Sequence, residues 1–404
     1  MEDKFADDVA KLCIKKYETL AKTGKPINNE WTVLSGFVLK ATDGSFSLLS
    51  LATGTKCLGG SEILKNKQDD IGAQLSDSHA EVLARRALLR YLYDQLEIAL
   101  NGKQSDIFYV DDTQQFKIRE GISLHFFSSQ MPCGDCSIFL KREATVVLSP
   151  AKLRKLENNE KYELEARRTS EQDTTIEDIY RTGAKCIGTE SNQDPKLPGK
   201  NYHVVGPLRI KPGRGNPTLS LSCSDKLAKW NVLGVQGALL SILIPKLKIA
   251  TIIIGGDTPY CKEAMERGIY KRFNILEGPK VLQASYCFVD KKGCGRTHPC
   301  PSSIIWCSVQ HRNIETAVNG RKQGATNKRK GQNLLISRRE LFYTFLKICD
   351  KITKLNKGTM HPKKMGYFHY KQAAINYQKL WKNLKLTNFS SWPTKPIYLQ
   401  NFFL

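Results

Sequence analysis

The sequence predicts an α/β fold, with strands and helices alternating through the first half and a helical part at the C-terminal end. Three observations predict it. Short apolar runs alternate with longer amphipathic segments. Hydrophobic residues make up 41% and charged residues 25% of the chain, as in ordinary globular proteins. The 404 residues show no internal repeat and suffice for one large core or two domains, of which we expect a single domain over residues 1–404.

Five segments have the composition of strands, being short, apolar and rich in β-branched or aromatic residues. The Asp43-Gly44 pair between the first two is a hairpin signal. The polar segments 53–57 and 66–76 are expected to be loops. The expected strands span residues 31–39, 46–52, 124–128, 145–148 and 249–256.

Six segments carry apolar residues at the three- and four-residue spacing of a helix. In the first, Val9, Cys13 and Tyr17 share one face. A further helix is expected to begin at Pro132-Cys133. The last two helices should pack on the α/β core. The expected helices span residues 8–20, 79–97, 225–244, 260–270, 334–352 and 370–386.

Residues 156–200 are polar, with few large apolar side chains, and we expect a surface insertion rather than a separate domain. Two basic loops follow, at 211–217 and 320–332. The net charge of +23 favours a polyanionic partner, and nucleic acid is the usual one. The alternative is a soluble protein that is merely basic.

The N-terminal residues are acidic and lack the basic start and apolar core of a secretory signal. No stretch approaches the ~20 apolar residues that cross a bilayer. We therefore expect an intracellular protein of the nucleus or the cytoplasm, not secreted and without a membrane partner. Its 12 cysteines should then be thiols and metal ligands rather than a disulfide framework.

One histidine, one glutamate and a pair of cysteines carry the clearest chemical signal. His79 and Glu81 stand two apart at the start of a predicted helix, and Cys133 and Cys136 follow in a Pro-Cys-x-x-Cys motif. This order is the signature of zinc-dependent nucleobase deaminases. A solvated helix start or a structural zinc knuckle would explain one half of it but not both. Glu81 is expected to move protons between water, the base and the departing ammonia.

The third zinc ligand has two candidates. Spacing alone favours Cys136, because cysteines three apart at a helix N-terminus meet easily and the helix dipole there favours thiolate. The other candidate is Cys223. A second zinc site at Cys294, Cys300 and Cys307 with His298 is not expected, because the spacings match no standard knuckle.

Paired cations interrupt two apolar helical stretches: Arg85 and Arg86 in one, and Lys226 and Lys229 in the other. Burying such charges is costly unless something pairs with them, and no matching cluster of acids is present. These cations predict a bound anion or a face on RNA. Ordinary solvated helix faces are the alternative.

Four motifs follow one another along the chain. They are TGTKC at 53–57, HAE at 79–81 with Arg85-Arg86, PCGD at 132–135 and SCSDKLAKWN at 222–231. Taken together, they resemble the adenosine-to-inosine deaminase domain shared by double-stranded RNA editing enzymes and the eukaryotic tRNA-specific adenosine deaminase. The resemblance covers nearly the whole chain. It implies a cytidine-deaminase-like three-layer core with a mixed sheet, and hydrolytic deamination of adenosine.

The resemblance also implies site residues. It nominates His79, Cys133 and Cys223 as the ligands of Zn²⁺, with Cys136 a small buried residue nearby. It places Thr55 and Lys56 near the target nucleotide. Arg214 stands where the editing enzymes usually carry a glutamate that fills the space left by a flipped base, and it either contacts RNA or is a solvated turn residue.

A second cofactor is implied by the same resemblance, namely inositol hexakisphosphate enclosed in the domain. Trp381 and Ala238 depart from the lysine and serine usual in the editing enzymes, so the contacts are not identical. A hydrogen-bonded relay from this pocket to the zinc, through Lys226, Asp77 and Lys211, is a further hypothesis. The implied pocket residues are Arg85, Arg86, Lys226, Lys229, Arg338, Tyr367, Lys371, Tyr377, Trp392 and Lys395.

Because deaminase-like sequence starts within the first tens of residues, we do not expect the double-stranded-RNA-binding domains that precede the deaminase in the editing enzymes. The chain is therefore expected to act on tRNA, at position 37 beside the anticodon of tRNA-Ala, without an obligate protein partner. Three alternatives remain: an enzyme that edits duplex RNA, a cytidine or free-nucleoside deaminase, and a non-catalytic protein that binds RNA or inositol phosphate. Charge and size disfavour the second, and Glu81 disfavours the third.

Overall fold

The computed structural model describes residues 2–404, apart from 66–70, 149–173, 188–192, 212–216, 326–331 and 356–364. Its centre is a mixed sheet of eight strands. Three neighbouring strands run parallel and the others pair antiparallel. In sheet order the strands are β14 (Lys280–Cys287), β13 (Thr251–Gly256), β8 (Ser123–Ser128), β2 (Leu34–Lys40), β3 (Phe46–Thr53), β16 (Ser302–Cys307), β17 (Ile314–Val318) and β18 (Arg321–Lys322).

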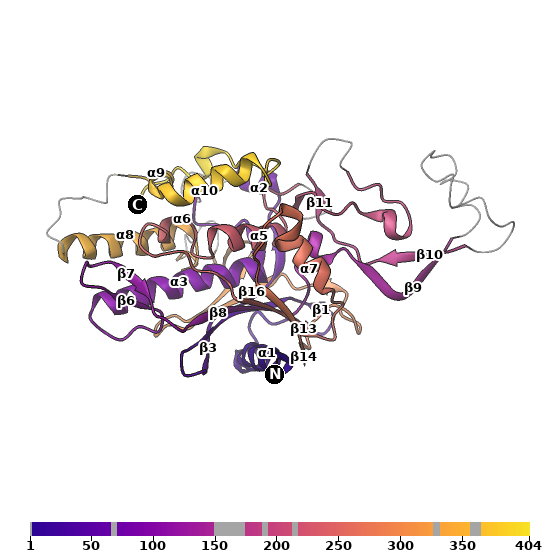
Figure 1. Ribbon diagram of the computed structural model, residues 1–404, viewed down its shortest axis with the longest axis horizontal. Coiled ribbons are helices and arrows are strands. Elements are labelled where there is room, and N and C mark those ends of the chain that lie inside the picture. Colours follow the sequence, from indigo (N-terminus) through magenta and orange to yellow (C-terminus); the bar gives the residue numbers. More distant parts are fainter. Residues whose placement is uncertain are drawn as a thin grey trace.

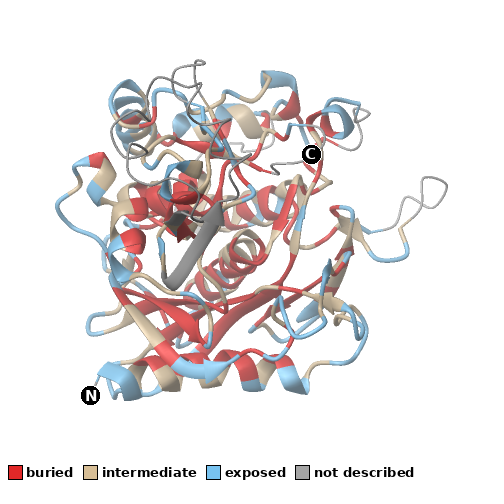
Figure 2. Ribbon diagram, turned by 90° about the vertical axis from the view of Figure 1, so that its right-hand side faces the viewer, coloured by how far each residue is buried: buried red, intermediate tan, exposed pale blue. Residues whose placement is uncertain are grey.

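Helices cover both faces of this sheet, which produces three layers (Figure 1). Helix α1 (Glu2–Thr19) packs on one face, and α3 (Ala80–Leu100) packs on the other. The central strands β8 and β13 are buried along most of their length, so neither face of the sheet meets water there. Figure 2 shows the buried residues concentrated along the sheet and on the helix packed against it.

A further set of helices lies beyond α3 (Figure 1). These helices carry the C-terminal part of the chain back over the core, as the sequence predicts. They are α5 (Cys223–Leu233), α6 (Gly237–Leu240), α7 (Lys262–Ile269), α8 (Arg338–Leu355), α9 (Tyr367–Ala373) and α10 (Ile375–Leu386), and the short α2 (Gly60–Leu64) precedes them in the chain.

Short two-stranded ribbons surround the main sheet. One of them, formed by β9 (Leu140–Leu148) and β10 (Thr174–Ile179), projects from the body as an arm (Figure 1). The other pairs are β1 (Glu30–Trp31) with β15 (His298–Pro299), β4 (Thr55–Cys57) with β5 (Asp77–His79), β6 (Phe108–Val110) with β7 (Phe116–Ile118), and β11 (Lys185–Cys186) with β12 (Arg209–Ile210).

The α/β class, the mixed sheet and the helical C-terminal part are confirmed, as is the hairpin at Asp43-Gly44 between β2 and β3. The first helix begins at Glu2 rather than at residue 8. Strands β14, β16 and β17 were not predicted, because polar residues flank or interrupt their short apolar runs. The expected insertion at 156–200 contains β10 and β11, and much of the rest lies outside the described residues.

Four local expectations are wrong for identifiable backbone reasons. The loop at 53–57 contains β4, because it pairs with β5. No α-helix begins at Pro132, since Gly134 has φ of 106° and only a 3-10 turn follows. The helix expected at 225–244 ends at Leu233, because Gly234 has φ of 85°. The helix expected at 370–386 is divided at Ala374, whose ψ of 64° is not helical.

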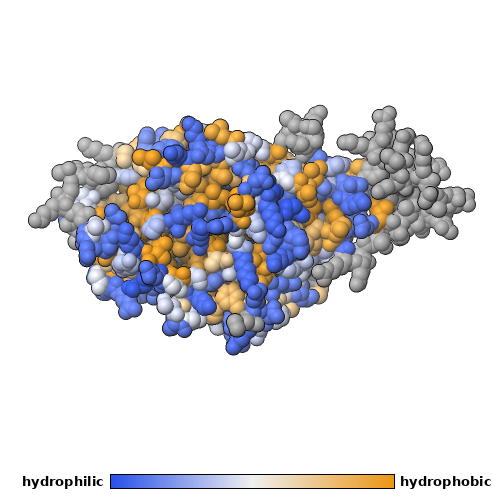
Figure 3. All heavy atoms as spheres, in the orientation of Figure 1, coloured by the Kyte–Doolittle hydropathy of each residue, from blue (hydrophilic) through white to orange (hydrophobic). Residues whose placement is uncertain are grey.

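None of the described helices is both long enough and apolar enough to span a bilayer. On the face shown in Figure 3, hydrophilic side chains surround apolar ones that gather over the middle of the molecule.

Candidate active site

One histidine and two cysteines converge where three elements meet. His79 is the N-cap of α3, Cys223 is the first residue of α5, and Cys133 lies in the loop after β8. The Nδ1 atom of His79 is 3.8 Å from Sγ of Cys133 and 3.7 Å from Sγ of Cys223. All three ligand atoms lie within 4.8 Å of one another, which is close enough for one metal ion.

Ser224 fastens the Cys133 loop to the start of α5. Its backbone N–H donates to the carbonyl oxygen of Cys133 at 3.0 Å, and its hydroxyl donates to the same oxygen at 2.9 Å. The helix itself is capped by Ser222, whose hydroxyl oxygen accepts from the backbone N–H of Asp225. These bonds bring Cys223 to Cys133 although 90 residues separate them.

Cys136 lies outside this group. Its thiol is fully buried and faces α7, with Sγ 3.9 Å from the carbonyl oxygen of Met265. Burial raises the pKa of the Cys136 thiol to about 12. The spacing argument for Cys136 assumed a helix at Pro132, and that helix does not form.

The two grouped cysteines differ in proton affinity. A hydrogen bond from Cys223 lowers the pKa of Cys133 well below its usual value, whereas burial raises the pKa of Cys223. Lys211 lies beside them, with its Nζ 3.0 Å from Sγ of Cys223. Negative charge on this pair of sulfurs is therefore stabilised by a buried ammonium.

Lys211 also connects the cluster to a second cation. Its Nζ lies 3.1 Å from Oδ2 of Asp77, and the same carboxylate oxygen accepts from Lys226. Burial opposes the charge of Lys211, but Asp77 and the two thiols outweigh it, so the pKa of Lys211 lies well above its usual value. The relay hypothesised for Lys226, Asp77 and Lys211 is present as a chain of contacts.

Two residues that adjoin His79, one along the chain and one across a strand pair, each carry a buried oxygen atom without a partner among the described residues. Glu81, in the first turn of α3, is 3% exposed, and its Oε2 has no hydrogen-bond partner among the described residues. Within the same residues, Oγ1 of Thr55 is also buried without a partner, and Thr55 pairs with His79 across β4 and β5. Buried polar atoms normally have a hydrogen-bond partner in the protein or in ordered water. These two oxygen atoms therefore indicate a position for water or substrate.

The other two expected substrate residues lie differently. Lys56 is exposed and follows Thr55 on β4. Arg214 lies outside the described residues.

The cations of the second expected site gather on one side of α3 and α5. They are half-buried, and they interact electrostatically with one another, while Lys229 and Lys371 also lie over aromatic rings. Within the described chain, the carboxylate that ion-pairs with a member is that of Asp77, to Lys226. The set comprises Arg85, Arg86, Lys226, Lys229, Arg338, Tyr367, Lys371, Tyr377, Trp392 and Lys395.

We call this set of residues the cation pocket. Its positively charged side chains repel one another. Burial, and then Arg338, lowers the pKa of Arg86 to about 9 and that of Lys395 to about 7. Burial, and then Lys371, lowers the pKa of Lys229 well below its usual value. Nη2 of Arg86 is buried without a partner among the described residues. A bound polyanion would relieve both the repulsion and the missing hydrogen bond.

Trp381 belongs to this pocket in a way the sequence did not reveal. The ammonium of Lys229 lies 3.6 Å from the centre of the Trp381 ring and 4.9 Å from that of Trp392. The two indoles therefore hold a cation for which the described chain offers no carboxylate.

Asp135 was also missed as a site residue. It is fully buried, with its Oδ1 accepting from Nε of Arg267 at 2.8 Å and its Oδ2 accepting from the backbone N–H of Gly206 at 2.6 Å. It ties the cysteine loop to α7 and to the segment before β12. The sequence did offer a signal for this role, because Asp135 is an acidic residue between Cys133 and Cys136.

All twelve cysteines are unpaired, as expected for thiols and metal ligands. In the described part of the chain, His79, Cys133 and Cys223 are the group that could hold a metal, and Cys294, Cys300 and Cys307 do not form another.

Comparison with known proteins places the chain in a family. A family model for the adenosine-deaminase (editase) domain matches residues 50–396. The chain belongs to the adenosine-deaminase (editase) domain family. The tRNA-specific adenosine deaminase 1 of Drosophila melanogaster is 36% identical, over 98% of this chain and 96% of its own. The Homo sapiens protein of that name is 34% identical, over 97% and 98%. The Drosophila melanogaster double-stranded RNA-specific editase Adar is 30% identical, over 62% of this chain and 33% of its own. The resemblance stated from the motifs is confirmed.

Gly134 allows the cysteine loop to lie against α5, and its replacement should disrupt the cluster. A Cβ at Gly134 would lie 2.3 Å from Oγ of Ser222, and the φ of 106° is itself strained for alanine. We expect Gly134→Ala to lower the free energy of unfolding by about 2 kcal/mol or more and to weaken metal retention. Urea unfolding and metal analysis of the purified protein measure these effects.

Gly44→Ala is the matched control, because Gly44 also has a positive φ, of 85°, but open space around its Cβ position. It should cost about 1 kcal/mol and leave the metal content unchanged. Equal effects of the two substitutions would show that close packing at Gly134 is unimportant.

Proposed function

We propose that this protein is a zinc-dependent hydrolase that converts adenosine to inosine in tRNA. The observation that carries the proposal is the Glu81 carboxylate, buried with one oxygen unpartnered, two residues from His79 in the cluster. One imidazole and two thiols are three protein ligands, the number that leaves one tetrahedral position of zinc open. His79, Cys133 and Cys223 would hold the metal, and the ammonium of Lys211 would favour the thiolate form.

The bound zinc would supply a Lewis acid that makes hydroxide available near neutral pH. The proton transfers fall to Glu81. Its carboxylate takes a proton from the attacking water, delivers it to a ring nitrogen of adenine and helps to protonate the departing amino group. Water and adenosine are thereby converted to inosine and ammonia. Because Glu81 is 3% exposed, bulk water does not compete for these protons.

Substrate contacts would come from the rim of the same site. Thr55 has a buried hydroxyl without a partner among the described residues, and it lies across from His79. Its hydroxyl would meet the target nucleotide, and the exposed ammonium of Lys56 would meet the RNA backbone beside it. Arg214 is assigned the same kind of contact from the 211–217 loop.

The choice of tRNA is supported by the relatives that cover the whole chain. They are named tRNA-specific adenosine deaminase 1, and the alignments span 96% and 98% of their lengths. We assign position 37, beside the anticodon of tRNA-Ala, as the target. An adenosine in a loop is extruded at lower cost than one in a duplex. We infer that an enzyme with this substrate acts in the nucleus or the cytoplasm. We also propose that the chain is one deaminase domain and that it acts without a second protein.

Editing of duplex RNA is the second candidate, favoured by the 30% identity to a double-stranded RNA-specific editase. That protein is matched over 33% of its length only. The tRNA assignment therefore accounts for more of the chain.

We also propose that the cation pocket encloses inositol hexakisphosphate. Its cations, the unpartnered Nη2 of Arg86 and the shortage of acids fit a compact polyanion. Burial first, and then repulsion between neighbouring cations, lowers the pKa of Lys229 and Lys395, and the ligand would neutralise that repulsion. It would stabilise the fold by about 3 kcal/mol at a concentration one hundred times its dissociation constant.

A comparison of three RNAs tests the reaction. Equal amounts of a full tRNA-Ala, its anticodon stem-loop and a long duplex are incubated with the purified protein, and inosine is measured by mass spectrometry. We expect inosine at position 37 in the tRNA and little in the duplex. Glu81→Gln is the control, expected to lower turnover by roughly 10²- to 10⁴-fold while zinc is retained. Preference for the duplex would replace the tRNA assignment with RNA editing.

The third ligand is tested by two cysteine variants. Cys223→Ala should purify with little zinc, because one of three protein ligands is gone. Cys136→Ala should keep its zinc, since this thiol faces Met265 rather than His79. Elemental analysis of both proteins decides the assignment, and the opposite pattern would transfer the ligand role to Cys136.

Native mass spectrometry, before and after denaturation, tests the enclosed polyanion. The wild-type protein should release one inositol hexakisphosphate per chain. Arg86→Ala should retain less of it and melt several degrees lower. Lys379→Ala removes an exposed lysine of α10 and should behave as wild type. A wild-type protein without any bound anion would refute this part of the proposal.

A further inference from the structure

The root of the β9–β10 arm is fastened to the loop that carries Cys133. The chain leaves this loop into β9 and returns from β10 through residues 180–182. The backbone N–H of Tyr180 donates to the carbonyl oxygen of Phe139 at 2.8 Å. The backbone N–H of Gly134 donates to Oγ1 of Thr182 at 3.0 Å. Arg181 therefore stands between two residues whose positions are fixed relative to the metal cluster.

Arg181 presents a stacked guanidinium to solvent. Its Cζ lies 4.0 Å from the centre of the Tyr202 ring, and 43% of the side chain is exposed. One Nη atom reaches the carboxylate of Asp178 at 3.3 Å. A guanidinium carries five N–H donors, so this single contact leaves other donors of Arg181 available.

The local charge balance remains positive at this point. Asp178 is shared between Arg181 and Lys141, so two cations face one carboxylate. Lys185, Lys196 and Lys200, all exposed, lie in the same part of the chain. A planar cation held on an aromatic ring is suited to a phosphate group, because its in-plane donors remain available.

We propose that Arg181 is a positioning residue that binds a phosphodiester of the RNA next to the nucleotide in the metal site. The inference rests on the proposed function, because it takes RNA as the substrate. Tyr202 holds the guanidinium flat, and the bond from Gly134 to Thr182 fixes its distance from Cys133. The contact reads no base, so it sets the register of the strand rather than its sequence.

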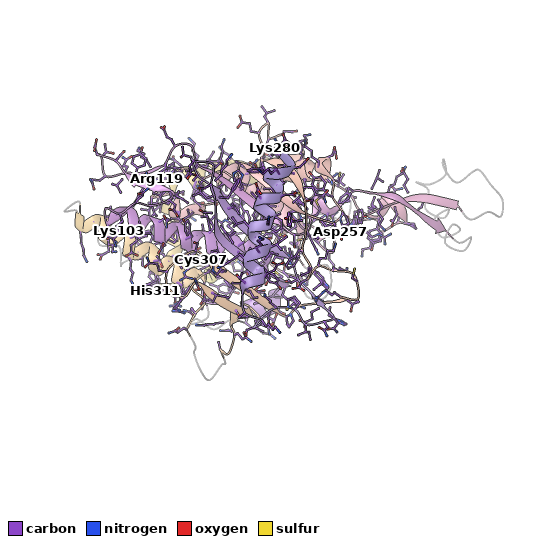
Figure 4. All side chains as sticks on the ribbon, turned by 90° about the horizontal axis from the view of Figure 1, so that it is seen from below. Lys103, Arg119, Asp257, Lys280, Cys307 and His311 are labelled. Carbon is purple, nitrogen blue, oxygen red and sulfur yellow. The ribbon has the colours of Figure 1, made fainter. Side chains whose placement is uncertain are left out.

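Binding measurements on three single variants test this contact. Dissociation constants of the anticodon stem-loop are measured by fluorescence anisotropy over a series of salt concentrations, for Arg181→Ala, Arg181→Lys and Lys103→Ala. Lys103 is an exposed lysine at the end of the molecule opposite the arm (Figure 4), which makes it a matched loss of one charge.

Arg181→Ala should weaken RNA binding by about 10-fold. It should also reduce the steepness of the plot of the logarithm of the association constant against the logarithm of salt concentration by roughly 0.7 to 0.9. Arg181→Lys should keep the slope and recover part of the affinity, because the charge remains but the stacked plane is lost. In turnover assays Arg181→Ala should raise KM and leave kcat at saturating RNA unchanged. Lys103→Ala should match the wild type.

Two results would overturn the inference. One is an Arg181→Ala protein with the affinity and salt slope of Lys103→Ala. The other is a loss of affinity accompanied by loss of zinc or by a lower melting temperature, which would make Arg181 a structural brace of the arm. The proposed function fails separately: a wild-type protein that binds RNA but forms no inosine refutes deamination, and the binding series still measures the phosphate contact.

Discussion

The cluster of His79, Cys133 and Cys223 and the cation pocket both depend on the ion pairs that the buried carboxylate of Asp77 makes with two lysines. Asp77 is 5% exposed and accepts hydrogen bonds from Lys211, which contacts Cys223, and from Lys226, which belongs to the cation pocket. One carboxylate between two ammonium groups leaves an excess positive charge. That excess can be balanced by thiolate on one side and by a bound anion on the other. Removing one partner from such a network typically costs about 3–5 kcal/mol, so neither site is independent of the other.

Helices α3 and α5 each have a residue of the cluster at their start and cations of the pocket further along. Helix α3 begins at the metal cluster, with His79 as its N-cap and Glu81 in its first turn, and carries Arg85 and Arg86 one turn later. Helix α5 begins with Cys223 and carries Lys226 and Lys229 along its length. Residues three and four apart share one face of a helix, which is why the chemistry at each helix start and the cations further along are rigidly connected. The cation pocket can therefore hold the positions of His79 and Cys223 at the two helix starts.

Aromatic rings replace acids where cations would otherwise lack a partner. Lys229 lies against Trp381 and Trp392 in the pocket, and Arg181 lies against Tyr202 at the root of the arm. A ring face attracts a cation without neutralising it. In both places the side chain is ordered while its charge remains available to a phosphate.

The sequence alone determined the chemistry that depends on short spacings. The fold class, the cluster residues His79 and Cys133, the neighbouring Glu81 and the cations that follow it could be predicted because a few adjacent residues carry each signal. Tertiary structure decided which cysteine lies beside His79. Spacing favoured Cys136, but the left-handed Gly134 prevents a helix there, and Ser224 brings Cys223 in from 90 residues away. It also fastened the segment that contains Arg181 to the Cys133 loop, through a hydrogen bond between Gly134 and Thr182 that no local pattern encodes. Contacts of such long range depend on packing and on backbone conformation, which spacing in the sequence does not specify.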